Sequence, residues 1–91
     1  MKKYLFLLSL LLTLHVQAVT LVWDPRPESE GVTSYNVYKI QGSHDVFLVS
    51  VDAPATSVNV DQWLTGRRTF FVRAVNSFGE GPDSSKVTIH K

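Results

Sequence analysis

The chain has 91 residues, with nine Lys and Arg against eight Asp and Glu, and no cysteine. This length allows one domain, and the lack of cysteine excludes a disulfide scaffold, a cysteine-built zinc site and a lipoprotein anchor. Residues 19–91 alone hold seven basic and eight acidic side chains, so the excess of positive charge belongs to the first 18 residues.

Residues 1–18 have the three-part plan of a secretory signal. A pair of lysines is followed by a short apolar run, and small residues stand at Val16 and Ala18. The alternative is a retained anchor, but the run is shorter than the roughly 20 residues that cross a bilayer. We expect cleavage between Ala18 and Val19, which predicts a secreted or periplasmic product that no longer contacts the membrane.

The remainder of the chain has the composition of an all-β domain. It holds 12 Val, 2 Ile and 6 Thr against 3 Leu and 3 Ala, and β-branched side chains favour strands. Alternating runs separated by turn-rich clusters predict six strands. We expect these at 19–23, 34–40, 46–51, 56–60, 69–76 and 86–90, with a turn at 41–45 and a loop at 77–85.

The core follows from the two-residue period of these strands, because every second side chain faces the same side of a sheet. The side chains that we expect to point inward are Trp23, Tyr35, Val37, Val58, Val60, Phe70, Val72 and Ala74.

Three segments occur in the order and spacing of a known family. They are Leu-Val-Trp-Asp-Pro at 21–25, Tyr-Asn-Val-Tyr at 35–38 after Gly31, and Phe-Phe-Val-Arg-Ala-Val-Asn-Ser-Phe-Gly-Glu-Gly at 70–81. With this combination the chain resembles the fibronectin type III domain family. The resemblance implies an immunoglobulin-like antiparallel β-sandwich, in the family's case a Greek key of seven strands.

The chain departs from the family pattern in two ways. After cleavage only four residues would precede Trp23, too few for the family's first strand, so about six strands and an exposed edge are expected. Sandwiches of this kind also carry a corner tyrosine near the start of the penultimate strand. Arg68 stands at that position here, so the turn before it must be held in another way.

A possible contact surface is predicted on the outer face of the same strands. Tyr38, Phe71 and Arg73 alternate with core positions, and aromatic residues beside arginine are typical of protein-contact centres. The alternative is ordinary cross-strand pairing on a solvated sheet. Phe78 is a further candidate because it stands among glycines and polar residues in the loop at 77–85; turn chemistry alone also explains that loop.

Catalysis, cofactors, metals and nucleic acid have no support in the sequence. His44 and His90 lie far apart along the chain, and no serine has a nucleophile-elbow signature. Arg67 and Arg68 form one basic pair in a slightly acidic chain, whereas nucleic-acid binding needs many phosphate contacts. We therefore expect a non-catalytic protein without cofactor or metal.

Three functions remain open. The family resemblance implies a module for protein contact or adhesion, although no Arg-Gly-Asp tripeptide occurs. The missing first strand suggests an assembly subunit or homo-oligomer completed by pairing at the exposed edge, a known mode of recognition. A carbohydrate-contacting component of a bacterial or phage particle is the third, with Trp63 as the tryptophan expected outside the core.

Overall fold

The computed structural model of the chain describes residues 19–90. The expected signal segment and its cleavage therefore lie outside the described residues. Within residues 19–90, no helix is long and apolar enough to span a membrane.

Seven strands and two short 3-10 turns make up the described chain. In chain order they are β1 (Thr20–Val22), η1 (Glu28–Glu30), β2 (Ser34–Gln41), β3 (His44–Asp52), β4 (Ser57–Asn59), η2 (Asp61–Trp63), β5 (Arg67–Asn76), β6 (Gly79–Asp83) and β7 (Val87–His90).

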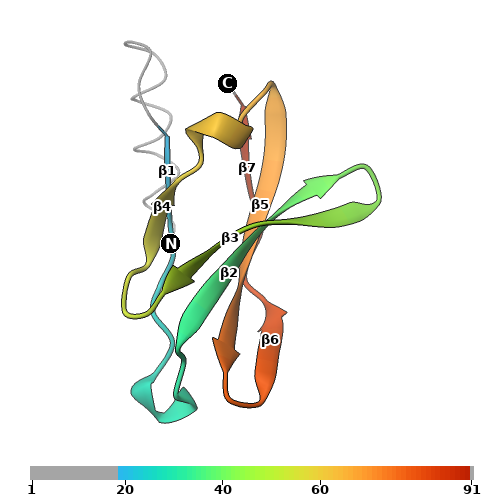
Figure 1. Ribbon diagram of the computed structural model, residues 1–91. Coiled ribbons are helices and arrows are strands. Elements are labelled where there is room, and N and C mark those ends of the chain that lie inside the picture. Colours follow the sequence, from blue (N-terminus) through green and yellow to red (C-terminus); the bar gives the residue numbers. More distant parts are fainter. Residues whose placement is uncertain (1–18, 91) are drawn as a thin grey trace.

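The strands form two antiparallel sheets, and the predicted all-β sandwich is confirmed at that level. The smaller sheet pairs β1 with β4. The larger has the order β3-β2-β5-β6, and β7 also pairs with β5. The two sheets lie on opposite sides of the core (Figure 1).

The predicted loop at 77–85 is wrong, because β6 occupies most of it. The long strand β5 is covered along one edge by two partners. Its first half, from Arg67 to Phe70, pairs with β7, and its second half, from Arg73 to Asn76, pairs with β6. The glycines and proline of β6 are typical of turns, so its extended form depends on pairing with β5 rather than on local propensity.

The turn predicted at 41–45 is also shorter in the structure. Strands β2 and β3 continue until only Gly42 and Ser43 separate them. Gly42 has φ +62°, a value that suits a two-residue hairpin turn and that a residue with a Cβ adopts at a cost. The hairpin therefore extends β3 at its start by two residues beyond the prediction.

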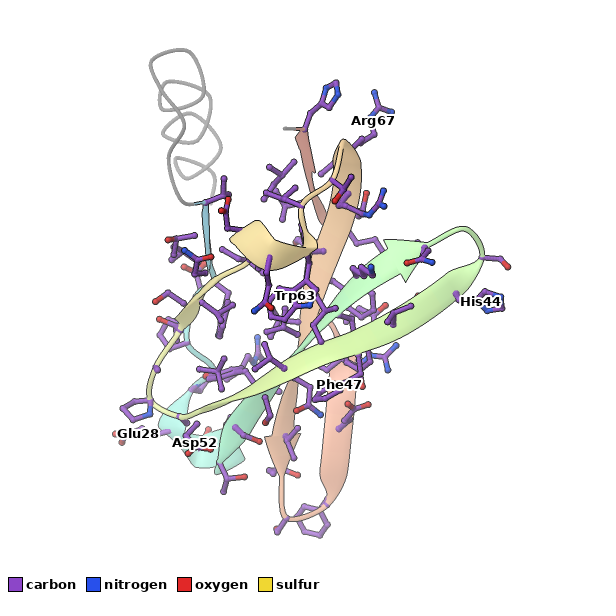
Figure 2. The ribbon with its side chains drawn as sticks, turned by 45° about the horizontal axis from the view of Figure 1, so that its top comes forward. Glu28, His44, Phe47, Asp52, Trp63 and Arg67 are labelled. Carbon is purple, nitrogen blue, oxygen red and sulfur yellow. The ribbon has the colours of Figure 1, made fainter. Side chains whose placement is uncertain are left out.

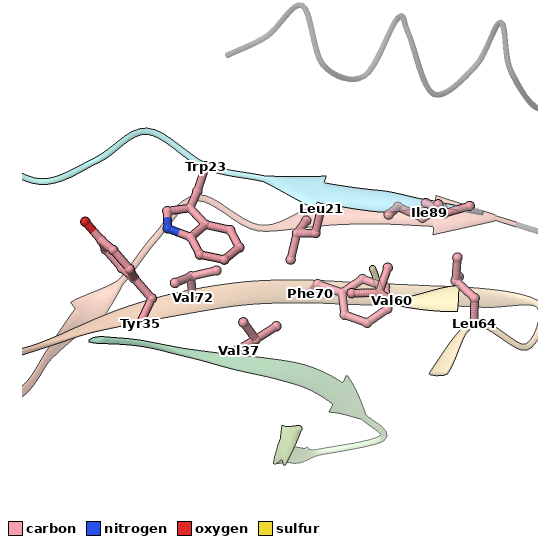
Figure 3. Close-up of a cluster of buried hydrophobic side chains, with 10 residues drawn as sticks. Leu21, Trp23, Tyr35, Val37, Val60, Leu64, Phe70, Val72 and Ile89 are labelled. Atoms are coloured by element: carbon pink, nitrogen blue, oxygen red, sulfur yellow. The ribbon is translucent and has the colours of Figure 1, made fainter. Parts of the chain in front are cut away.

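Most of the predicted core is confirmed. Trp23, Tyr35, Val37, Val60, Phe70 and Val72 are buried, together with Val19, Leu21, Leu64 and Ile89. Figure 3 shows these side chains converging between β1 on one side and β2 and β5 on the other. Val58 and Ala74 are half-buried and pack against this cluster rather than within it.

The segment before β5 is held without a corner tyrosine. The amide of Leu64 donates to the Asp61 carbonyl (3.1 Å), the amide of Trp63 to the Val60 carbonyl (2.9 Å), and Leu64 is buried. Trp63 is half-buried and packs against the buried cluster rather than within it, so it lies at the margin of the core.

Candidate functional site

The predicted contact residues Tyr38, Phe71 and Arg73 lie together on the outer face of the larger sheet. The register of β2 and β5 places Tyr38 directly opposite Phe71, and Asn36 directly opposite Arg73. The rings of Tyr38 and Phe71 are stacked, with centroids 5.2 Å apart and planes at 5°. We call these three residues and the side chains packed on them, Phe47 and Lys86, the outer-face cluster.

Phe71 is at the bottom of the outer-face cluster and only 1% exposed. Its ring is covered by Tyr38, by the guanidinium of Arg73 at 5.1 Å and by the ammonium of Lys86 at 5.1 Å. The prediction that Phe71 lies on the outer face is correct. The expectation that its ring is open to a partner is wrong, because the ring is buried. Phe71 therefore supports the sheet from outside.

The more exposed ring of the cluster belongs to Phe47, which is 53% exposed. It meets Tyr38 edge to face, with centroids 5.8 Å apart and planes at 74°. Figure 2 labels it on β3, between His44 and Asp52. Sequence reasoning did not single out Phe47, although its pairing with Tyr38 follows from the β2–β3 register.

Arg73 connects three carboxylates across the outer face. Its Nε donates to Asp83 Oδ1 at 2.7 Å, while Nη1 and Nη2 lie 3.3 Å from Glu80 Oε1 and Asp45 Oδ2. Its guanidinium carbon also lies 4.5 Å from the centre of the Tyr38 ring. Arg73 is thus occupied by contacts within the domain.

These contacts shift the pKa values of their members. The hydrogen bond from Arg73 lowers the pKa of Asp83, and Tyr38 and then Asn36 lower the pKa of Glu80 by donating to its carboxylate. The pKa of Tyr38 is raised, mainly because its hydroxyl hydrogen-bonds to Glu80. Both carboxylates are therefore ionised at neutral pH, and the cluster stays paired.

Phe78 is separate from the outer-face cluster, at the turn between β5 and β6. It is 96% exposed, which confirms the predicted exposure. Asn76 holds this turn in place, because its Oδ1 accepts the Phe78 amide at 2.8 Å and its Nδ2 donates to the Glu30 carbonyl at 3.0 Å. These bonds hold the backbone of the turn, and the Phe78 ring projects from it into solvent.

A groove of about 890 Å³ lies between the edges of the two sheets. One wall is β1 with Trp23 and Asp24, and the other comes from β5, β6 and β7. The apolar side chains that line it are Leu21, Val22, Trp23, Val32, Tyr35, Phe70, Phe71, Val72, Ala74, Phe78 and Val87. Several of these side chains belong to the core, so the groove reaches the core from one side of the sandwich.

The backbone of β1 adds hydrogen-bonding groups to this groove. The amide of Trp23 donates to the Thr56 carbonyl, and the amide of Val60 donates to the Val19 carbonyl, both at 3.0 Å. Because hydrogen-bonded pairs alternate in an antiparallel ladder, Thr20 and Val22 direct their amides and carbonyls away from β4. Among residues 19–90, β4 is the one strand paired with β1.

The free edges of β6 and β3 are less suited to pairing than that of β1. Pro82, within β6, has no amide to donate, which protects that edge. The outer edge of β3 is long, but Asp45 and Asp52 stand near its ends, and no residue of β3 lines the groove. β1 has neither proline nor charge, and it borders the groove directly.

The titratable residues of the described chain do not gather into a metal site. No group of three or more His, Asp and Glu within residues 19–90 is placed to hold a metal ion. His44 lies at the tip of the β2–β3 hairpin, far from Arg67 at the start of β5 (Figure 2). His90 pairs with Arg67 across β7 and β5, so the two histidines do not meet.

Comparison of the chain with protein-family models, with curated proteins and with solved structures found no match. The groove and the edge of β1 therefore have to be interpreted from their own geometry.

Proposed function

We propose that the protein is an exported, non-catalytic module for protein contact that accepts an extended segment of another polypeptide along β1. The proposal includes a fibronectin type III-like sandwich without the family's first strand, in a secreted or periplasmic protein. One observation carries it: the edge of β1 that no other strand within residues 19–90 covers borders an apolar groove of about 890 Å³.

The edge and the groove complement each other as a binding site. An added strand gains main-chain hydrogen bonds at Thr20 and Val22, and its inward side chains enter the groove beside Leu21 and Trp23. Hydrogen bonds supply affinity in this mode of recognition, and side-chain pockets supply specificity. Both requirements are met on the same side of the sandwich.

The outer-face cluster is less suitable than the groove as a surface for binding another protein. Phe71 is buried, and Arg73 is already bonded to Asp45, Glu80 and Asp83. A partner would have to compete with these contacts. Among residues 19–90, the groove side of the sandwich offers the backbone groups of Thr20 and Val22, which point away from β4, beside apolar walls.

The test uses residues 19–91, which contain all seven strands, and a capped synthetic peptide of alternating Val and Thr. Calorimetric titration should detect binding to the unchanged protein and at least about tenfold weaker binding to Val22→Pro. This substitution removes an amide that points toward the groove and leaves the β1–β4 hydrogen bonds of Leu21 and Trp23 in place.

Ser57→Pro is the matched control. Ser57 pairs with Val22 in the same register, so its amide points away from β1, toward the other edge of the small sheet. It should bind the peptide like the unchanged protein, and circular dichroism should show both variants folded. Equal binding by Val22→Pro and Ser57→Pro would overturn pairing at β1. Light scattering over a concentration series would show whether a second copy occupies the same edge.

A further inference from the structure

The backbone groups on the groove side of β1 are arranged symmetrically about Leu21. Thr20 and Val22 stand one residue before and one residue after it, and both direct their amides and carbonyls away from β4. Each of the two residues offers one donor and one acceptor. Rotation by 180° about Leu21 therefore exchanges the two residues and leaves the pattern of hydrogen-bonding groups unchanged.

A second copy of β1 fits this pattern. When two copies pair antiparallel with Leu21 at the centre, Thr20 of each copy lies directly opposite Val22 of the other. The residues of such a pair exchange both of their backbone hydrogen bonds, so the two pairs form four bonds. A shifted register would place Thr20 or Val22 opposite a residue outside β1 (Thr20–Val22), so only the centred register uses both residues of both copies.

The side chains of β1 suit the same arrangement. Residues directly opposite each other in an antiparallel pair place their side chains on the same face. Leu21 of the second copy therefore lies on the groove side, beside Leu21 of the first. On the other face, Thr20 of the second copy covers Val22, which is one of three exposed large hydrophobic residues within residues 19–90.

We infer that two copies of the chain pair through β1 in an antiparallel, two-fold dimer centred at Leu21. The inference rests on the proposed strand-accepting function and names a second copy as an occupant of the same edge. β1 has neither charge nor proline, the features that commonly protect an edge strand from its own kind. Two-fold pairing is closed, so association stops at the dimer.

The short strand makes this dimer weak. Four backbone hydrogen bonds of ordinary net strength correspond to a dissociation constant on the order of 1 mM, and contact between the two Leu21 side chains lowers it toward about 0.1 mM. At micromolar concentrations the protein is then monomeric, and β1 is open to a peptide. At higher concentrations two copies block the edge of each other.

Sedimentation equilibrium of residues 19–91 between about 10 µM and about 2 mM tests the association. The mass should rise from that of a monomer toward that of a dimer and no further. Val22→Pro removes two of the four hydrogen bonds and should weaken the dimer, whereas Ser57→Pro should leave it unchanged. A monomer at every concentration, or a mass that grows beyond the dimer, overturns the inference.

Two double variants test the register. Thr20→Lys with Val22→Lys places lysine opposite lysine in both pairs, whereas Thr20→Lys with Val22→Glu places opposite charges there. Both positions are exposed, so circular dichroism should show both variants folded. The Lys-Glu variant should dimerise about tenfold more tightly than the Lys-Lys variant, and the difference should shrink in about 0.5 M salt. Equal dimerisation of the two variants overturns the register centred at Leu21.

Peptide binding separates the inference from the proposed function. The uncharged alternating Val-Thr peptide, titrated into about 10 µM protein, should bind both double variants about as tightly as the unchanged protein, because it carries no charge to meet the lysines. If the peptide binds while the protein stays monomeric up to about 2 mM, the strand-accepting function stands and the dimer is overturned. Absence of both peptide binding and dimer overturns both.

Discussion

Tyr38 and Phe71 stack face to face across β2 and β5, with ring centroids 5.2 Å apart. This contact lies on the outer face of the larger sheet, opposite the side that meets the core. Because Tyr38 and the cationic side chains of Arg73 and Lys86 cover Phe71, the sheet has apolar packing on both faces. The aromatic residues that looked available for a partner thus contribute to stability.

Removing the buried ring should destabilise the fold. Phe71→Ala leaves a cavity under Tyr38 and should lower the free energy of unfolding by about 3 kcal/mol. Phe47→Ala removes a ring that is 53% exposed and should cost less than about 1 kcal/mol. Urea denaturation of both variants measures the difference. Similar losses for the two variants would contradict the structural role assigned to Phe71.

Arg73 should make stability depend on pH in the acid range. The pKa values of Glu80 and Asp83 are lowered in the folded protein, so the stability from their ionised forms is present above their unfolded pKa values. It is lost as the pH falls below about 4.5 and through the lowered folded values. Arg73→Met should therefore flatten the fall in stability between about pH 5 and pH 2.

The control for this prediction is Arg67→Met, which removes an exposed arginine at the start of β5. In this variant the free energy of unfolding should fall at acid pH as steeply as in the unchanged protein. Denaturant unfolding at a series of pH values measures both variants. An equally steep fall in stability for Arg73→Met and the unchanged protein would show that the ionised forms of Glu80 and Asp83 do not depend on this arginine.

Filling the groove should block binding without unfolding the protein. Val87→Phe enlarges a side chain in the groove wall, and it should weaken binding of the alternating peptide at least about tenfold. Stability should change by less than about 1 kcal/mol, because the added atoms enter open space. Thr88→Phe enlarges the adjacent residue, which is exposed and does not line the groove, and it should bind normally. Unchanged binding by Val87→Phe would mean that peptide side chains do not enter there.

Asn76 and Phe78 should behave differently despite lying in the same turn. Asn76→Ala loses hydrogen bonds to the Glu30 carbonyl and the Phe78 amide, and should cost about 1 kcal/mol of stability. Phe78→Ala removes a ring that is 96% exposed and should change stability by no more than about 0.5 kcal/mol. Thermal unfolding distinguishes them, and a larger loss for Phe78→Ala would show that its ring packs on the domain.

The inward face of each strand could be predicted from the sequence because burial repeats every second residue. Trp23, Val37 and Phe70 are buried as expected. The period of two also placed Phe71 on the outer face, but it could not show that face to be covered. That covering depends on long side chains from other strands, Tyr38 and Lys86, whose positions are set by register and by the tertiary fold.

Strand β6 shows the other limit of sequence reasoning. Gly79, Gly81 and Pro82 favour turns locally, yet pairing with β5 holds this segment extended. The groove also depends on the tertiary fold: the sequence indicated an exposed edge where the family's first strand would pair, but one wall of the groove comes from β5, β6 and β7. A groove between segments that are distant in the sequence leaves no recognisable residue pattern along the chain.

Amide hydrogen exchange along β1 tests the central claim most directly. In the free protein the amides of Thr20 and Val22 point away from β4 and should exchange quickly, while that of Leu21, within the β1–β4 ladder, should exchange more slowly. Adding the alternating Val-Thr peptide should slow Thr20 and Val22 and leave β3 unchanged. New protection on β3, with Thr20 and Val22 still exchanging quickly in the complex, would contradict strand addition at β1.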